Sequence, residues 1–202
     1  ISGLAISGTT AGSIEGGGSI TLGDKELTVG SLGTNTIFFG VIDGLGGSLV
    51  KVGSGALILS GVSTYTGPTT VDGGILVVNG SLLSDVTVNG GSLMGSGDVG
   101  ALTIGAGGVH APGDSIGTQT INGNYVNSGT LRIEVDAAGQ SDLIVVNGGV
   151  DITGAILQIV QLPGGFGPVL QYLIIQNDGG NPVVGSFASI SSTFAFLTPS
   201  VT

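Results

Sequence analysis

Short apolar segments alternate with glycine-rich turns along the chain, most regularly over residues 52–81. Within each segment apolar residues alternate with small or polar ones, so each segment has one face to bury. The apolar positions are Leu57, Leu59, Val71, Leu76 and Val78. The turn signals between them are Gly61, Gly67-Pro68 and Asp72-Gly73-Gly74. No helix of ordinary length fits in these gaps, and the pattern predicts a strand–turn–strand–turn–strand unit of ~20 residues.

The same rhythm continues on both sides of this unit. It recurs over residues 20–29, 36–50, 86–104 and 131–135. In the last of these, Leu131, Ile133 and Val135 face one way, whereas Arg132 and Glu134 face the other. Units this small cannot bury an apolar face alone, so we expect them to stack. The predicted fold is all-β, a right-handed parallel β-helix of about eight or nine coils, with its hand following from the rule for parallel crossovers.

After Leu162 the rhythm changes, because two Pro- and Gly-containing stretches, 163–165 and 167–168, interrupt the array. The apolar segments 172–175 and 183–184 flank a turn-forming stretch and read as a β-hairpin. Phe187, Phe194 and Phe196 add aromatic surface near the end of the chain. Since the open end of a solenoid exposes a ladder edge, this hairpin is predicted to be a cap. The expected organisation is β-helix coils in residues 1–162 and a C-terminal cap in residues 163–202.

The composition favours a solenoid over a disordered chain. Glycine accounts for 42 of 202 residues, yet 41% of the residues are hydrophobic and only 8% are charged. Disordered chains are poor in apolar residues. We therefore expect the glycines to form corners and the aliphatic residues to fill a narrow core.

Charge and cysteine content exclude several classes of function. The chain has no cysteine, which excludes disulfides and Cys-based zinc sites. Its net charge of −10 opposes binding to nucleic acid or to anionic membranes. The chain begins with Ile1 and shows neither a signal-peptide pattern nor a long apolar run, so we expect it to be an excised fragment.

Candidate catalytic and metal-binding residues are few. A polysaccharide lyase or hydrolase needs clustered carboxylates, but the acids here stand singly, mostly beside Gly or Asn in turns, and only Glu134, Asp136 and Asp142 come close together in the sequence. The single histidine, His110, has no second His or Cys to complete a metal site. Ser115 lacks a nucleophile-elbow motif. We therefore predict no catalytic residue, no metal site and no cofactor.

Two stretches resemble bacterial autotransporter passengers. The pattern Gly53-x-Gly55-x-Leu57-x-Leu59-x-Gly61, continued through residues 64–80, resembles the passenger-associated strand repeat, with Ser63 where the family usually has Asn. Residues 109–118 resemble the VxxPGxSxGT element near the end of such passengers, with Asp114 where Asn is usual. The segment Gly139-Gln140-Ser141-Asp142, which follows at the family's spacing, completes the resemblance.

The resemblance implies a structural stalk or scaffold of a surface-exposed adhesin. It places the chain on the extracellular face of the bacterial outer membrane, or outside the cell after cleavage. The implied partners are a host surface or matrix component, or neighbouring bacterial cells, together with a downstream outer-membrane β-barrel of the same polypeptide. We expect a monomer that binds no nucleic acid. The alternative is a carbohydrate-active β-helix enzyme, which would show an acidic groove with paired carboxylates on one coil face.

The resemblance also implies that residues from about Val109 onward, an autochaperone-like region, support passenger folding during secretion. In a one-dimensional array the first coils cost entropy to form, and each later coil gains a template. The expected core of this stable end consists of Leu131, Ile133, Val135, Leu157, Ile159 and Phe196.

Overall fold

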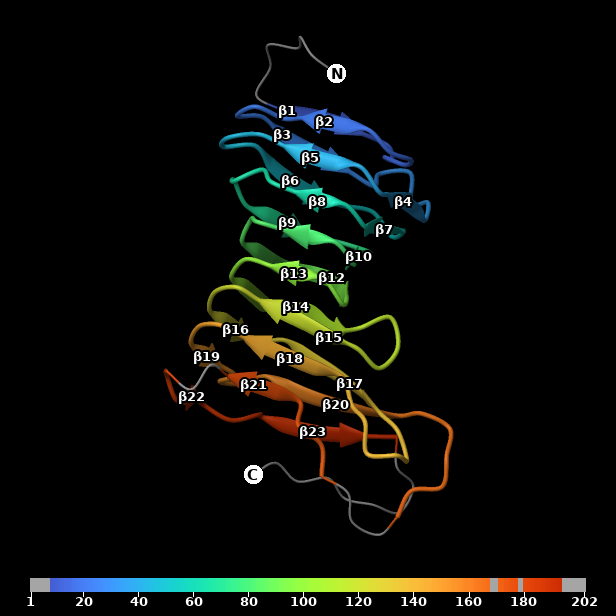
Figure 1. Ribbon diagram of the computed structural model, residues 1–202, viewed down its shortest axis with the longest axis vertical. Helices are drawn as coiled ribbons and strands as arrows, with labels where there is room; N and C mark the ends of the chain where they lie inside the picture. The colour runs from blue at the N-terminus through green and yellow to red at the C-terminus, as the bar shows by residue number, and fades with distance from the viewer. Residues whose placement is uncertain (1–7, 168–170, 178–179, 194–202) are drawn as a thin grey trace.

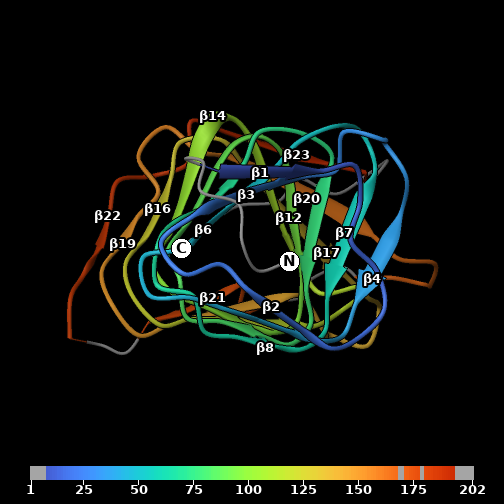
Figure 2. The ribbon, with the colours of Figure 1, turned by 90° about the horizontal axis from the view of Figure 1, so that it is seen from above.

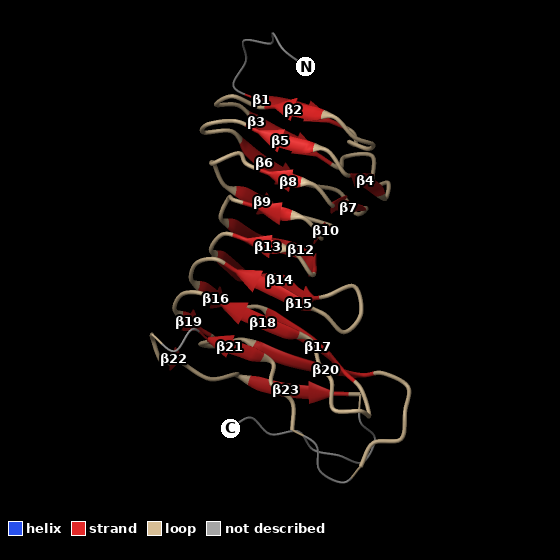
Figure 3. Cartoon of the chain, in the orientation of Figure 1, coloured by secondary structure: helices blue, strands red, loops and turns tan. Residues whose placement is uncertain are grey.

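A computed structural model describes residues 8–167, 171–177 and 180–193, which form one elongated stack of short strands (Figure 1). The described residues contain strands and connections but no helix (Figure 3). Accordingly, no helix in this part of the chain could cross a lipid bilayer. Neighbouring strands in the stack are parallel along every ladder, which confirms the predicted all-β parallel β-helix.

The strands form three faces of parallel strands, called here the first, second and third faces. The first face contains β1 (Gly8–Ala11), β3 (Glu26–Val29), β6 (Ser48–Lys51), β9 (Thr69–Val71), the first halves of β12 (Val86–Gly95) and β14 (Leu102–Pro112), β16 (Tyr125–Asn127), β19 (Val150–Asp151) and β22 (Val183–Val184). The second face contains β4 (Thr36–Phe38), β7 (Ala56–Leu59), β10 (Ile75–Val78), the second halves of β12 and β14, β17 (Thr130–Val135), β20 (Ile156–Gln161) and β23 (Ser189–Ser192). The third face contains two ladders in line with each other. The first is β2 (Ser19–Thr21) with β5 (Val41–Asp43), and the second is β8 (Val62–Ser63), β11 (Ser81–Leu82), β13 (Asp98–Val99), β15 (Thr118–Ile121), β18 (Leu143–Val146) and β21 (Ile175–Asn177).

Each complete coil contributes one strand segment to each face. Within the described residues, seven coils are complete: β3–β5, β6–β8, β9–β11, β12–β13, β14–β15, β16–β18 and β19–β21. This is fewer than the eight or nine predicted, because coils lengthen toward the C-terminus. Val86 pairs with Leu102, 16 residues on, whereas Val150 pairs with Val183, 33 residues on.

The three faces enclose a narrow interior, as the view along the stack shows (Figure 2). Mostly aliphatic side chains fill this interior. On the second face the inward residues Leu57, Leu76 and Leu93 lie in register and are at most 2% exposed. Each such leucine contributes ~1.5–3 kcal/mol by leaving water. The same row then passes through His110 before it returns to Leu131, so a polar residue interrupts the apolar column.

Glycine is required where successive coils approach closely at the corner between the second and third faces. A Cβ on Gly61 would collide with the carbonyl oxygen of Gly40 in the preceding coil. In the same way, a Cβ on Gly80 would collide with the carbonyl oxygen of Gly61, and one on Gly97 with that of Gly80. Any side chain in this column would push two coils apart. The high glycine content predicted to mark corners is explained here by backbone contact between coils.

The predicted C-terminal hairpin is wrong in the described residues. β21 pairs in parallel with β18, β22 with β19 and β23 with β20, so the chain continues to stack on the preceding coil. The turn signal between β21 and β22 did not distinguish the two arrangements, because turn chemistry is similar in a hairpin and in a coil corner. The division of the chain at residues 162 and 163 stays a prediction.

The last coils are less buried than expected. Leu131, Ile133, Val135 and Leu157 are at most 1% exposed, whereas Ile159 is only partly buried. Val183 and Val184 in β22 are 48% and 53% exposed. Phe187 packs partly against the core, and Phe194 and Phe196 lie outside the described residues. The densest core therefore lies in the middle of the stack.

Candidate functional site

The two C-terminal motifs of the sequence meet at one corner of the solenoid, between the second and third faces. β14 ends at Pro112 and β15 begins at Thr118, so residues 113–117 form this corner in one coil. β17 ends at Val135 and β18 begins at Leu143, so residues 136–142 form it in the next. Stacking places the two corners against each other. We call residues 113–117 and 134–142 the motif junction.

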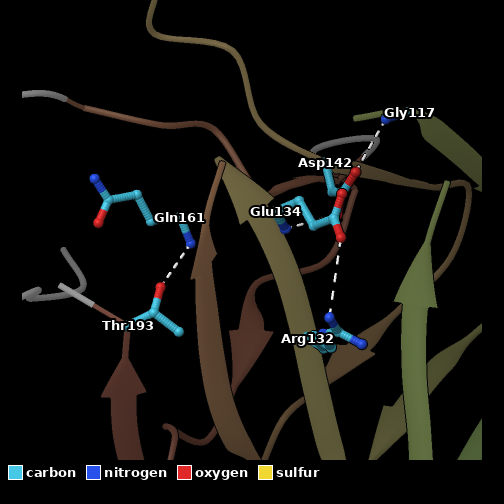
Figure 4. A network of polar contacts seen from close by, with 6 residues as sticks. All are labelled: Gly117, Arg132, Glu134, Asp142, Gln161 and Thr193. Carbon is cyan, nitrogen blue, oxygen red and sulfur yellow. Dashed lines mark hydrogen bonds and ion pairs between the residues drawn. The ribbon is translucent and has the colours of Figure 1, made fainter. Parts of the chain in front are cut away.

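Asp142 is the centre of the motif junction (Figure 4). Its side chain is buried, with Oδ1 accepting the N–H of Gly117 at 3.0 Å and Oδ2 accepting the N–H of Glu134 at 2.7 Å. Its own N–H donates to the carbonyl of Glu134, and the N–H of Leu143 donates to that of Gly117. One carboxylate therefore ties both corners together.

Burial raises the pKa of Asp142 to about 6, with a smaller contribution from the nearby Glu134 carboxylate. The two backbone N–H groups and Arg132 lower the same pKa and only partly offset the burial. Arg132 lies 4.0 Å from Glu134, and both side chains are partly exposed, so this ion pair stabilises little. Glu134 and Asp142, which come close together in the sequence, thus also lie close in space, but both oxygens of Asp142 are already bonded to backbone.

The space beside Asp142 is small. A hollow of about 20 Å³ lies there, and its lining includes Asp114, Arg132, Glu134 and Asp142. This volume holds about one water molecule. A sugar ring therefore has no room beside the buried carboxylate.

The first motif is held by its glycine and by Asp114. Gly113 has a φ of +86°, and a Cβ there would collide with the carbonyl of Ser115. Gly113 and Gly95 exchange two backbone hydrogen bonds, of 2.8 and 3.2 Å. Asp114 accepts a hydrogen bond of 2.8 Å from Asn79 Nδ2. The loop thus reaches back over two earlier coils, and Ser115 is exposed on it.

Asp136 orders the second motif and the chain that follows. Its Oδ1 accepts the N–H groups of Ala138 and Gln140 at 2.9 and 2.8 Å. Its backbone carbonyl accepts the hydroxyl of Tyr172 at 2.6 Å, and Ser141 donates to the carbonyl of Leu173 at 3.0 Å. The last coil is pinned in the same way, since Gln161 donates its N–H to Thr193 Oγ1 at 2.8 Å (Figure 4). The motif junction therefore contacts both the coil before it and the coil after it.

Next to the motif junction, His110 is fully buried in a polar layer of the core. Its Nε2 lies 2.8 Å from Gln119 Oε1 and its Nδ1 lies 3.0 Å from the Tyr125 hydroxyl. Because the amide oxygen can only accept, we assign the proton to Nε2, and Nδ1 accepts from Tyr125. Asn127 donates to the Tyr125 oxygen at 2.7 Å. Burial lowers the pKa of His110 to about 4, so the ring is neutral at neutral pH.

Several buried polar residues were not foreseen as part of any site. Gln119, Tyr125 and Asn127 occupy inward positions, as does Lys51 on the first face. The alternation of the strands was a usable signal, since Gln119 is two residues from the buried Ile121. Among the described residues, no group of three or more His, Cys, Asp or Glu side chains gathers as a metal site would require.

Comparison with known proteins fits these observations. Residues 49–78 match the family model described as Passenger-associated-transport-repeat. The chain carries an autotransporter passenger repeat. This confirms the resemblance, and the repeat covers β6 from Leu49 through β10.

Relatives of this passenger segment are much longer proteins. An "Extracellular serine protease" of Serratia marcescens is 40% identical over 111 residues, which cover 51% of the segment and 11% of that protein. The "Adhesin BmaC autotransporter" of Brucella suis biovar 1 (strain 1330) is 37% identical over 131 residues, which cover 61% of the segment and 4% of that protein. The segment thus spans about a tenth or less of the curated relatives it matches. Autotransporter passengers of this kind are displayed on the cell surface or secreted, in agreement with the expected location.

Proposed function

We propose that this passenger segment is a structural stalk of a surface-exposed adhesin that also supports passenger folding during outer-membrane secretion. The observation that carries the proposal is the parallel ladder of the first face, which runs without a break from β1 to β22 and is accompanied near its C-terminal end by the motif junction. Such an array grows in one dimension, so the number of coils sets the distance between its two ends. By family, the polypeptide continues into an outer-membrane β-barrel. The distal partner is a host surface, a matrix component or a neighbouring bacterial cell.

We further propose that the segment is not itself an enzyme. Asp142 has both oxygens bonded to backbone, and His110 has both ring nitrogens engaged in the core. A larger hollow of about 380 Å³ beside β16, β19 and β22 contains a single carboxylate, Asp151, which accepts the N–H of Thr153. The small hollow beside Asp142 does bring Asp114, Glu134 and Asp142 together, but it has room for about one water molecule and cannot seat a sugar between two carboxylates.

The stalk and folding roles are separable in the full-length protein. Deleting one whole coil, residues 69–85, removes β9–β11 and rejoins equivalent positions, since Thr69 pairs with Val86. We expect normal surface display and a stack shortened by one strand spacing, ~4.8 Å, measured as the length of the purified passenger by solution scattering. Asp142→Ala should instead reduce the amount of protease-resistant passenger at the cell surface. Normal display of the Asp142 variant would contradict the folding role, and lost display or an unchanged length of the shortened protein would contradict the stalk.

A further inference from the structure

Lys51 is a lysine buried in a core that is otherwise mostly aliphatic. It is 1% exposed and stacks in register between Val29 of the preceding coil and Val71 of the following one. The ion pairs found among the described residues are Lys25–Asp24 and Arg132–Glu134, so no carboxylate pairs with Lys51 there. A buried charge is costly unless its hydrogen bonds are satisfied. The groups around Nζ therefore decide how this lysine is tolerated.

Three backbone carbonyl oxygens converge on the Lys51 ammonium. The oxygens of Val52, Gly53 and Gly73 lie 2.8, 3.4 and 3.1 Å from Nζ. An ammonium group has three N–H donors, so each oxygen can take one. Val52 and Gly53 form the corner that follows Lys51, whereas Gly73 belongs to the equivalent corner of the next coil. The ammonium thus joins two successive coils.

Glycines leave the space that the ammonium occupies. A Cβ on Gly74 would lie 2.8 Å from Nζ, and one on Gly30 would lie 3.2 Å from it. Gly53 and Gly74 have φ values of +71° and +66°, a conformation that glycine adopts without strain and that shapes these tight corners. Lys51, the three residues whose carbonyls surround its Nζ, and Gly74 all fall within the matched repeat, residues 49–78.

We propose that the corner of this passenger repeat is a carbonyl cage for a primary ammonium ion, and that Lys51 is its built-in occupant. The cage is complete only after the next coil has docked, because Gly73 supplies the third oxygen. Lys51 is therefore a positioning residue that fastens the corner of the next coil to the corner of its own coil. When the side chain is shortened, the cage takes a small alkylammonium ion from solution. This inference concerns the repeat and is independent of the stalk role.

Hydrogen exchange at the corner tests the proposal on the whole chain. Lys51→Met keeps most of the apolar stem but leaves three buried carbonyls without a donor. Exchange of the Asp72 N–H, which donates to the Lys51 carbonyl, should become at least about tenfold faster. The control is Lys25→Met, whose lysine is exposed and paired with Asp24, and it should change nothing at this corner. Wild-type exchange in the Lys51→Met variant would overturn the proposal.

Chemical rescue separates a cation cage from an ordinary packing role. Lys51→Ala removes the atoms of propylammonium, so added propylammonium should restore slow exchange at Asp72. Tetramethylammonium carries the same charge but has no N–H, and it should not. Lys51→Met should respond to neither ion, since its side chain fills the space. Equal responses to the two ions, or no response in a folded alanine variant, would contradict the cage.

The ammonium can also be observed directly, which covers the case of an alanine variant that fails to fold. In the wild-type protein at neutral pH, Lys51 should give a slowly exchanging ammonium signal by nitrogen-15 NMR, and the exposed Lys25 should not. Burial lowers the pKa of the Lys51 amine, so a neutral amine at pH 7 is the physical alternative. Absence of the protected signal in the folded protein would refute the charged cage.

Discussion

Replacing His110 with leucine should weaken the middle of the stack although leucine suits the surrounding column. His110 lies in register between Leu93 and Leu131, so the new side chain has apolar neighbours. The change leaves Gln119 Oε1 without a donor and the Tyr125 hydroxyl without its acceptor. Each buried polar group left unpaired costs ~1–3 kcal/mol, and the better apolar burial returns about 1 kcal/mol. The expected net loss at pH 7 is roughly 2–3 kcal/mol.

The pH dependence of this loss makes the prediction specific. The pKa of His110 is lowered to about 4 in the folded protein, against an ordinary value near 6.5. The unfolded chain therefore binds more protons between pH 4 and 6.5, and folding stability falls as pH falls through that window. The difference is worth about 3 kcal/mol for wild-type protein and nothing for the leucine variant. The two proteins should consequently approach equal stability near pH 4.

Urea denaturation from pH 7 to pH 4, combined with hydrogen exchange, measures both effects. The amide of Gly129, which donates to Asn127 in the same polar layer, should exchange faster in the variant than in the wild type at pH 7. The chain has one histidine, so any histidine titration in the NMR spectrum belongs to His110. Parallel stability curves for the two proteins across this pH range would refute a neutral, doubly bonded His110. A titration near the ordinary value would do the same.

Three further predictions concern the motif junction, the glycine corner and the folding nucleus. The pKa of Asp142 is raised to about 6, so the folded state binds more protons than the unfolded chain between about pH 4 and 6, and the contribution of this group to folding stability rises as the pH falls. Asp142→Asn in the His110→Leu background should remove this rise in urea titrations. A rise that persists in the double variant would exclude Asp142 as its source. Gly61→Ala should lower the free energy of unfolding by at least ~2 kcal/mol, through collision with the Gly40 carbonyl, whereas Gly165→Ala, with open space around it, should change thermal melting little. Ile133→Asp buries a carboxylate at a cost of several kcal/mol and should abolish the protease-resistant core, whereas Leu22→Asp should only loosen the N-terminal end of the stack. If proteolysis instead left a resistant C-terminal fragment in the Ile133 variant and none in the Leu22 variant, the folding nucleus would lie elsewhere.

The coil architecture was accessible from sequence because alternation and turn spacing are local. Leu57, Leu76 and Leu93 each sit in a short alternating segment, and stacking places them in one row. The C-terminal hairpin was mispredicted because a turn signal does not say whether the next strand pairs with its neighbour or with the preceding coil. That choice depends on which strand edge is free to pair. The edge of β18 is free, and β21 pairs with it in parallel.

The chemistry of the buried polar residues was only partly accessible. Alternation places Lys51 and Gln119 inward, but their tolerance depends on partners one coil away, such as the Gly73 carbonyl and the His110 ring. The motif containing Asp142 could be recognised from the sequence, but its contacts could not. Its contact with Gly117 requires a loop of the preceding coil, which no local reading of the sequence supplies.

The corner between the second and third faces gives the molecule an unequal mechanical resistance along its length. In four successive coils this corner is two residues long, at 39–40, 60–61, 79–80 and 96–97, and the glycine backbones touch. It then lengthens to residues 113–117 and 136–142, and the connection after β20 runs on to β21 at Ile175, as the loops on the right of Figure 1 show. Under a pulling force the short corners are held to one another mainly by their backbones, whereas the longer corners are also bonded to neighbouring coils through Asp114, Asp142 and Tyr172. We therefore expect the coils with short corners to separate before those with long corners when the molecule is stretched.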